Sequence, residues 1–183
     1  KDLPEKIEIE QTVDMSVEQG KLYGQVLQEV RASVLGEVER VGVAKAHIQI
    51  LAGLTRLRQI ACDPRLLGLP RAFTDEDSGK LAALRDLLQE AWSGGHRVLV
   101  FSQFVSMLTL IRKACEEDGI KYEYLDGSTK DRSERVDRFQ SDPTVTVFLI
   151  SLKAGGMGLN LTAADTVVHF DPWWNPAVED QAT

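Results

Sequence analysis

The chain has few cysteines and histidines and no long apolar run, and each of these absences excludes a class of protein. Its 183 residues include two cysteines and three histidines. Cys62 and Cys115 lack CxxC spacing and neighbouring histidines, which excludes a disulfide scaffold or zinc finger and predicts two reduced, packed thiols. No apolar stretch approaches the ~20 residues of a membrane helix, and the first twenty residues are too charged for a signal peptide. We therefore expect a protein of the cytoplasm or nucleoid, or of a eukaryotic nucleus, with no membrane partner and no metal site.

Positive charge is outnumbered by negative charge, with 21 lysines and arginines against 28 aspartates and glutamates. The formal net charge is −7, while 43% of the residues are hydrophobic, which is typical of a soluble globular chain. A charge of −7 argues against a polyanion binder that uses its whole surface, so any contact with DNA must be local. Only residues 43–72 are basic, and this pattern is typical of a solvated helix face. The basic residues of that stretch are Lys45, Arg56, Arg58, Arg65 and Arg71.

The first part of the chain, residues 1–70, predicts a short strand followed by two helices. Residues 6–13 alternate polar with apolar side chains, which favours a half-exposed strand. Ser16 and Gln19 have the spacing of a capping box at the start of the first helix. The second helix is expected over residues 43–61, and it ends at the Asp-Pro pair that follows. Its apolar stripe is expected to face a partner, through Ile48, Leu51, Leu54, Leu57 and Ile60.

These two helices are expected to form an antiparallel pair laid on the main domain. Residues 71–77 contain an acidic run and little apolar content, so they predict a linker or mobile loop. From Ser78 to Thr183 strands alternate with helices, which predicts an α/β fold with a parallel sheet and helices on both faces. The expected strands are residues 97–101, 121–125, 145–150 and 166–170. One expected helix begins near residue 78, before the first strand, and two more begin between strands near residues 104 and 131.

Residues 144–176 are the centre of this second domain. An apolar, β-branched run over residues 145–150 is typical of a strand buried on both faces. It leads into the glycine-rich loop 154–160, and the next apolar run leads into the aromatic loop 171–176. Both loops lie just past the carboxyl end of a strand, where open α/β sheets bind their ligands.

The glycine-rich loop does not match a standard nucleotide motif. The chain has no GxxxxGK[ST] sequence, and residues 155–158 lack the third glycine of a dinucleotide fingerprint. The Ser78-Gly79-Lys80 triplet has no strand or leading glycine before it, so it predicts a helix cap. Taken alone, the loop is compatible with a tight turn or with an anion site.

Four longer motifs occur in a fixed order: FSQF at 101–104, LDGST at 125–129, SLKAGGMGLNL at 151–161 and DPWWNP at 171–176. Together they resemble the second motor lobe of the Swi/Snf-type DNA translocases, within the superfamily-two helicases. Residues 1–70, with the sequence LRQIACDPRLL at 57–67, resemble the lead-in and helical protrusion of that lobe. The resemblance therefore spans nearly the whole chain and implies a RecA-like fold.

The resemblance also implies roles for individual residues. Those expected to contact DNA are Gln103, Thr129, Ser151, Lys153, Trp174 and Asn175. Those expected to border the nucleotide are Gly156, Gly158 and Asn160. From the residues alone, Lys153 also fits a solvated loop, and either Trp173 or Trp174 fits the core. His169 is predicted to be a buried, hydrogen-bonded histidine rather than a ligand.

The family features that bind ATP most directly are missing from these 183 residues. The P-loop lysine and the DExH carboxylates belong to the first lobe, and the chain stops before the arginine fingers of motif VI. The resemblance implies half of an ATP-dependent double-stranded DNA translocase, with no catalytic residue in this chain. ATP and Mg²⁺ would be bound mainly by the first lobe. A nucleotide-free protein-interaction module and an RNA helicase lobe are the alternatives.

Overall fold

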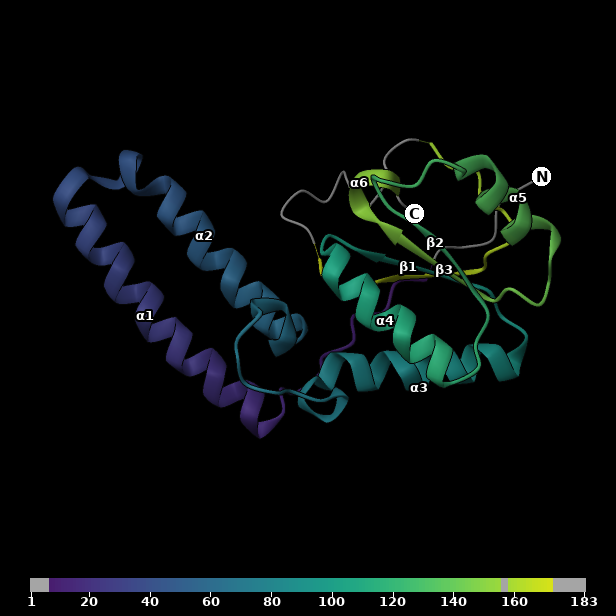
Figure 1. Ribbon diagram of the computed structural model, residues 1–183, viewed down its shortest axis with the longest axis horizontal. Helices are drawn as coiled ribbons and strands as arrows, with labels where there is room; N and C mark the ends of the chain where they lie inside the picture. The colour runs from purple at the N-terminus through teal and green to yellow at the C-terminus, as the bar shows by residue number, and fades with distance from the viewer. Residues whose placement is uncertain (1–6, 156–157, 173–183) are drawn as a thin grey trace.

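Four parallel strands form the single sheet of the computed structural model, which describes residues 7–155 and 158–172 (Figure 1). The sheet order is β2-β3-β1-β4. The bounds are Val98–Ser102 for β1, Tyr122–Leu125 for β2, Val147–Ser151 for β3 and Thr166–His169 for β4. Ser102 is in register with Ser151, so the central strands end at the same level. The predicted parallel α/β fold is confirmed.

Helices cover both faces of the sheet, as Figure 1 shows. Side chains alternate between the faces along the fully buried strands β1 and β3, as expected for a central parallel pair. One set packs with α3 (Gly79–Gly94) and α4 (Val105–Glu117). The other set packs with α5 (Arg132–Ser141) and α6 (Leu152–Gly155). Cys62 and Cys115 lie buried, and burial raises the pKa of both thiols to about 12.

The first two helices, α1 (Val17–Val41) and α2 (Val43–Cys62), form the predicted antiparallel pair. The capping box of Ser16 and Gln19 is present at the start of α1. A single residue, Gly42, with φ of 80°, links the two helices. No helix in the described ranges is both long enough and apolar enough to cross a membrane.

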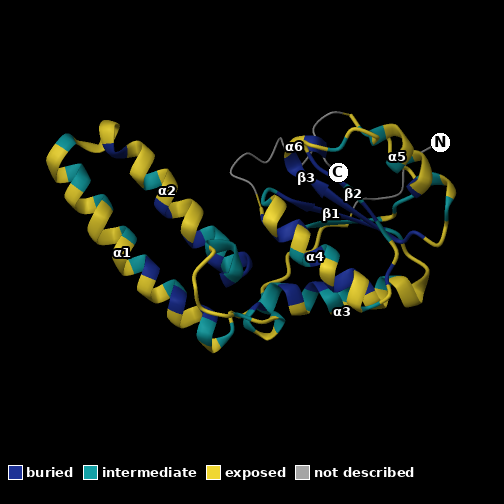
Figure 2. Ribbon diagram, viewed as in Figure 1, coloured by how far each residue is buried: buried dark blue, intermediate teal, exposed yellow. Residues whose placement is uncertain are grey.

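The helical pair projects away from the sheet instead of lying on it, which corrects the prediction (Figure 1). Its base is buried, where Leu57 and Ile60 of α2 pack with residues of α1, and Gly53 and Ala46 of α2 are buried further out. Further out, Ile48 is 74% exposed, and Leu51 and Leu54 are also exposed (Figure 2). The prediction of one continuous buried stripe along α2 is therefore wrong for its outer half.

The strand predicted over residues 6–13 does not form in the described part, residues 7–13. Ile7 and Ile9 are more than four-fifths exposed, at 82% and 85%. Alternation alone does not make a strand, because a strand needs a neighbour to accept its backbone hydrogen bonds. The described sheet contains only β1 to β4, so residues 7–13 pair with none of its strands.

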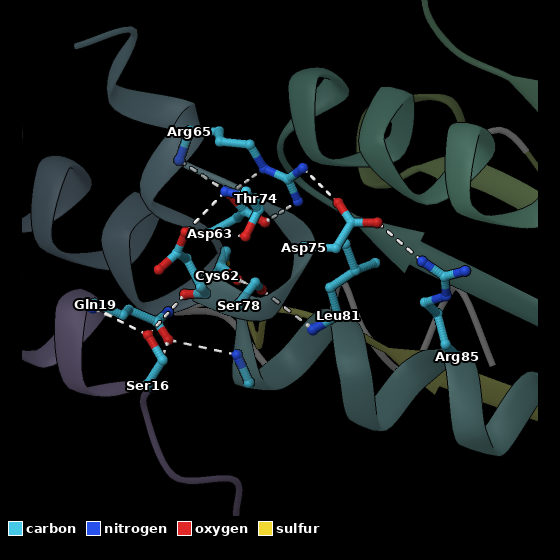
Figure 3. Close-up of polar contacts among 12 residues, drawn as sticks. Ser16, Gln19, Cys62, Asp63, Arg65, Thr74, Asp75, Ser78, Leu81 and Arg85 are labelled. Carbon is cyan, nitrogen blue, oxygen red and sulfur yellow. Dashed lines mark hydrogen bonds and ion pairs between the residues drawn. The ribbon is translucent and has the colours of Figure 1, made fainter. Parts of the chain in front are cut away.

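Residues 71–77, predicted as a linker or mobile loop, take part in ion pairs with both neighbouring regions. They include a short 3₁₀ helix, Asp75–Asp77. The carboxylate of Asp75 lies 2.5 Å from Arg65 Nη1 and 2.9 Å from Arg85 Nη1 (Figure 3). Arg65 also pairs with the buried Asp63, and Arg85 with Asp118 of the α4 end. The acidic run therefore links the helical pair to α3 and α4.

Buried hydrogen bonds hold the two helices of the pair together and join the pair to α3 of the sheet domain. Gln19 is buried, and its Nε2 donates to the carbonyl oxygen of Ile60 at 2.7 Å. Ser78 caps α3 through the Leu81 N–H and donates its hydroxyl to the Cys62 carbonyl at 2.8 Å (Figure 3). Buried polar groups that are satisfied in this way hold three helices in one arrangement.

Replacing Gly79 with alanine is expected to destabilise this joint. An added Cβ would lie 2.2 Å from the carbonyl oxygen of Asp14, so backbone must move, at a cost of about 1–3 kcal/mol. Gly20 is the matched control in α1, because nothing lies within 4 Å of its added Cβ. Gly20→Ala should raise the free energy of unfolding by about 0.5–1 kcal/mol. Urea unfolding measures both, and a Gly79→Ala variant as stable as the wild type would contradict the close approach.

Candidate functional site at the carboxyl ends of the strands

All four strands end at one edge of the sheet, because they are parallel and in register. Gln103 follows β1, the loop 126–129 follows β2, α6 follows β3, and Asp171 follows β4 after one residue. The structure therefore brings the predicted residues Gln103, Thr129, Ser151 and Lys153 to the same edge. This is the edge at which open α/β sheets bind ligands.

The end of β3 is shaped by a close approach between α6 and β1. Gly155 lies against Phe101, and an added Cβ would come within 2.7 Å of the Phe101 ring. Ser151 is buried, and its hydroxyl oxygen accepts from the Ala154 N–H at 3.3 Å. Lys153 is exposed on the same short turn. Within the described residues, the hydroxyl of Ser151 is thus used to cap α6, while Lys153 presents its ammonium group to solvent.

The second half of the glycine-rich loop is held against α5. Gly158 has φ of 68°, a left-handed conformation that favours glycine. Gln140 of α5 donates to the Asn160 carbonyl at 3.2 Å and accepts from the Ala163 N–H at 2.8 Å. Sequence reasoning missed Gln140, since nothing in its helix marks it as a loop contact. A shallow hollow of about 260 Å³ lies here, lined by Arg132, Ser133, Val136, Asp137, Gly158, Leu159 and Asn160.

The loop after β2 closes on its own carboxylate. Asp126 accepts from the Ser128 hydroxyl at 2.6 Å and its N–H at 2.8 Å, and from the Tyr124 hydroxyl at 2.9 Å. These bonds, led by that of the Ser128 hydroxyl, hold the pKa of Asp126 below its usual value. The Thr129 hydroxyl accepts from the Asp126 N–H at 3.0 Å. Thr129 is therefore fixed in the loop, and its contact with DNA stays a prediction.

Asp171 is a buried carboxylate that sequence reasoning did not select. It is 3% exposed, and it accepts from the Ser102 hydroxyl at 2.5 Å and from the Gln103 N–H at 3.1 Å. Burial raises its pKa even though these hydrogen bonds act in the opposite direction. The available signal was an aspartate placed directly after an apolar strand, at the ligand-binding edge.

The side chain of Gln103 contacts the helical pair. Its Oε1 accepts from Arg58 Nη1 at 3.1 Å, and Arg58 Nη2 donates to the carbonyl of Pro172. Arg58 was interpreted as part of a solvated basic face, which is wrong for this residue. Whether Gln103 also contacts DNA stays a prediction. Gly156, Trp174 and Asn175, and the question of which tryptophan is exposed, lie outside the described residues.

Comparison with known proteins identifies the family. Residues 79–183 match the family described as the helicase conserved C-terminal domain. The structure also matches the C-terminal domain of a SWI2/SNF2 ATPase from Sulfolobus solfataricus, with a TM-score of 0.77 and 33% identity over 91% of this chain and 72% of that one. The chain belongs to this family of SWI2/SNF2 helicase lobes. The predicted RecA-like fold and the Swi/Snf resemblance are confirmed.

Other relatives of this SWI2/SNF2 lobe are much longer proteins. An uncharacterised ATP-dependent helicase of Mycoplasma pneumoniae is 36% identical over the whole chain, which spans 17% of that protein. The chromatin-remodelling ATPase INO80 of Aspergillus oryzae is 51% identical over 108 residues, which are 58% of this chain and 8% of that protein. The Sulfolobus ATPase core in complex with double-stranded DNA has a TM-score of 0.79 and 31% identity, over 93% of this chain and 35% of that one.

The buried carboxylate predicts a pH effect that Asp171→Asn should abolish. Because folding raises the pKa of Asp171, the folded state binds its proton more tightly than the unfolded chain does. The carboxylate therefore lowers stability at neutral pH, and this loss is relieved as the pH falls through the raised pKa. We expect the wild type to gain unfolding free energy relative to Asp171→Asn between about pH 7 and about pH 4. Denaturant unfolding of both proteins measures it, and a pH-independent difference would contradict the inferred burial.

Proposed function

We propose that this lobe is one half of a motor that uses ATP to move along double-stranded DNA. The observation that carries the proposal is the gathering of Lys153, the loop 126–129 and the loop 158–160 at one edge of the sheet. That edge belongs to a SWI2/SNF2-type lobe, and the Sulfolobus core of the same type is in complex with double-stranded DNA. The relatives named above favour DNA over RNA as the track.

The DNA side of this edge would grip the phosphate backbone. Lys153 is exposed, and its charge is of the local kind that an acidic chain requires. Contacts to phosphate position a protein without reading sequence, which suits a motor that advances along any duplex. Gln103, Thr129, Ser151, Trp174 and Asn175 complete the proposed DNA-binding set. The motor would work wherever its DNA is held, in the cytoplasm and nucleoid or in a nucleus.

The nucleotide side of this edge would meet ATP at its sugar, through Gly156, Gly158 and Asn160. A side chain at Gly158 would meet nothing within 4 Å, and Asn160 is exposed, so this loop has room for a ligand. These groups carry no charge for phosphate oxygens. We therefore assign the ATP phosphates and Mg²⁺ mainly to the first motor lobe, where Mg²⁺ would neutralise charge on the transferred phosphoryl group. Closure of the two lobes around ATP would move this lobe along the duplex.

Duplex DNA is expected to stimulate ATP hydrolysis by the full-length parent. The test compares turnover with no nucleic acid, with duplex DNA of two unrelated sequences, and with RNA. Stimulation by both duplexes and not by RNA supports the proposal, because backbone contacts are indifferent to sequence. A parent without its P-loop lysine is the control. The proposal would be overturned if RNA stimulated turnover as much as duplex DNA does, or if neither nucleic acid stimulated it.

The isolated chain of 183 residues should hydrolyse ATP only at background level. It contains no GxxxxGK[ST] sequence, and the groups that hold Mg²⁺ and the γ-phosphate are assigned to the other lobe. A coupled-enzyme assay, with and without duplex DNA, checks this. The matched variant is Gly158→Val, which should leave the background unchanged. Robust turnover that Gly158→Val abolishes would refute the assignment of a half motor.

Changing Lys153 to alanine should weaken duplex binding equally for unrelated sequences and lower the salt slope by about one. The reason is that one phosphate contact is lost and one fewer counterion is released. Lys113→Ala is the control, since Lys113 is an exposed lysine of α4 that pairs with Glu117 at 3.6 Å. Fluorescence anisotropy at several salt concentrations gives both slopes. Equal slopes for Lys153→Ala and the wild type would remove Lys153 from the DNA-binding set.

A further inference from the structure

Arg58 joins three segments that are far apart in the chain. It lies in the last turns of α2, within the helical pair. Its Nη1 donates to Oε1 of Gln103, 45 residues away, and its Nη2 donates to the carbonyl of Pro172, 114 residues away. Gln103 begins the segment after β1, and Pro172 is the second residue of the aromatic loop 171–176 after β4. A single guanidinium from outside the sheet domain therefore fixes the start of two of its edge segments.

The two acceptors of Arg58 are neutral, and a buried carboxylate lies next to both of them. Asp171 lies between the two bonded segments, and it accepts from Ser102 and Gln103 while almost fully buried. The positive charge of Arg58 acts on this carboxylate against the effect of burial. On the other side of Asp171, Lys80 of α3 donates to the Phe170 carbonyl at 3.4 Å. Cations from α2 and α3 thus hold the backbone on both sides of the buried aspartate.

Arg56 shows what an ordinary arginine of the same helix does. It lies two residues earlier, points elsewhere on the helix, and pairs with Glu29 of α1 at 3.5 Å. Both partners of that pair are largely exposed, so the pair contributes little to stability. Arg56 matches Arg58 in residue type, helix and approximate depth along the pair. It therefore provides a control for loss of charge from α2.

We propose that Arg58 is a positioning residue that couples the helical pair to the DNA-stimulated step of the motor. The proposal rests on the function proposed above. Gln19 joins α1 to α2 and Ser78 joins α2 to the start of α3, so a displacement of the pair would move Arg58 with it. Arg58 passes this displacement to Gln103 and Pro172, which lead into two predicted DNA-contacting segments. Binding of DNA at this edge and the placement of the helical pair are thereby linked.

The chemistry of the contact requires arginine. Two acceptors, an amide oxygen and a backbone carbonyl, are bonded by two separate nitrogens of one planar group. Lysine carries a single ammonium nitrogen at the end of a flexible stem, so it does not reproduce this geometry. Arg58→Lys should therefore behave like Arg58→Ala, although it keeps the charge. A purely electrostatic role for Arg58 predicts the opposite result.

The first measurement uses the full-length parent carrying Arg58→Ala, Arg58→Lys or Arg56→Ala. The ratio of DNA-stimulated to basal ATP turnover should fall at least about tenfold in both Arg58 variants and stay unchanged in Arg56→Ala. Melting temperatures are recorded for each variant. A wild-type ratio in Arg58→Lys, or a wild-type ratio with a lowered melting temperature in Arg58→Ala, would overturn the proposal in favour of charge or packing alone.

The second measurement separates this inference from the proposed function. Hydrogen exchange of peptides covering residues 101–104 and 168–172 should speed up by about tenfold in both Arg58 variants and not in Arg56→Ala. If the unmodified parent is not stimulated by DNA, the proposed function fails, and exchange alone decides whether Arg58 holds these segments. Unchanged exchange in Arg58→Ala would overturn the inference even in a parent that DNA stimulates.

Discussion

Parallel pairing of four strands is the constraint on which this structure depends. Since β1 pairs with β3 on one side and β4 on the other, the loops that follow them must leave from a common edge. Both faces of the sheet must be covered by helices, because buried parallel strands present apolar side chains on both faces. Gly155 shows how tight the arrangement is, since a methyl group there would collide with Phe101. Loops of unrelated sequence become one functional edge through this packing.

The second constraint is the joint between the helical pair and the sheet domain. It combines buried neutral hydrogen bonds, from Gln19 and Ser78, with a chain of ion pairs through Asp75. The buried bonds set the geometry, because a buried donor or acceptor without a partner is costly. The ion pairs are partly buried, and they fix the orientation of residues 71–77 against the helices. Together they make the helical pair an extension of the SWI2/SNF2 lobe rather than a tethered appendage.

Sequence patterns correctly predicted the features that depend only on residues close together in the chain. The capping box of Ser16 and Gln19 and the helix start at Ser78 involve neighbours within one helical turn, and both are present. The predicted strand at residues 6–13 fails because its alternation has no neighbouring strand to pair with. The predicted stripe of α2 fails before Leu57, because the buried positions there are the small residues Ala46 and Gly53, while the larger Ile48, Leu51 and Leu54 are exposed.

In the candidate site, too, the sequence predicted local features and did not predict contacts between distant residues. Motif order placed Lys153 and Gly158 at the ligand-binding edge, because strand ends and glycine loops are readable in sequence. The contacts of Arg58 with Gln103 and Pro172 were not predictable, since they join residues up to 114 positions apart and leave no local signal. Asp171 is intermediate: its place after β4 was visible, but its burial depends on Ser102 and on α2.

The length of the helical pair turns the rigid base into a lever. At 25 residues, α1 is about 37 Å long, since each helical residue adds about 1.5 Å. A rotation of about 10° at the base would therefore carry the tip near Gly42 through roughly 6 Å. Conversely, a load applied at the tip would act on the base through the whole length of the helix, so the force at the base would be several-fold larger. Arg58, which bonds Gln103 and Pro172, lies near this base in the last turns of α2, so a large movement of the tip would reach these two residues as a small one.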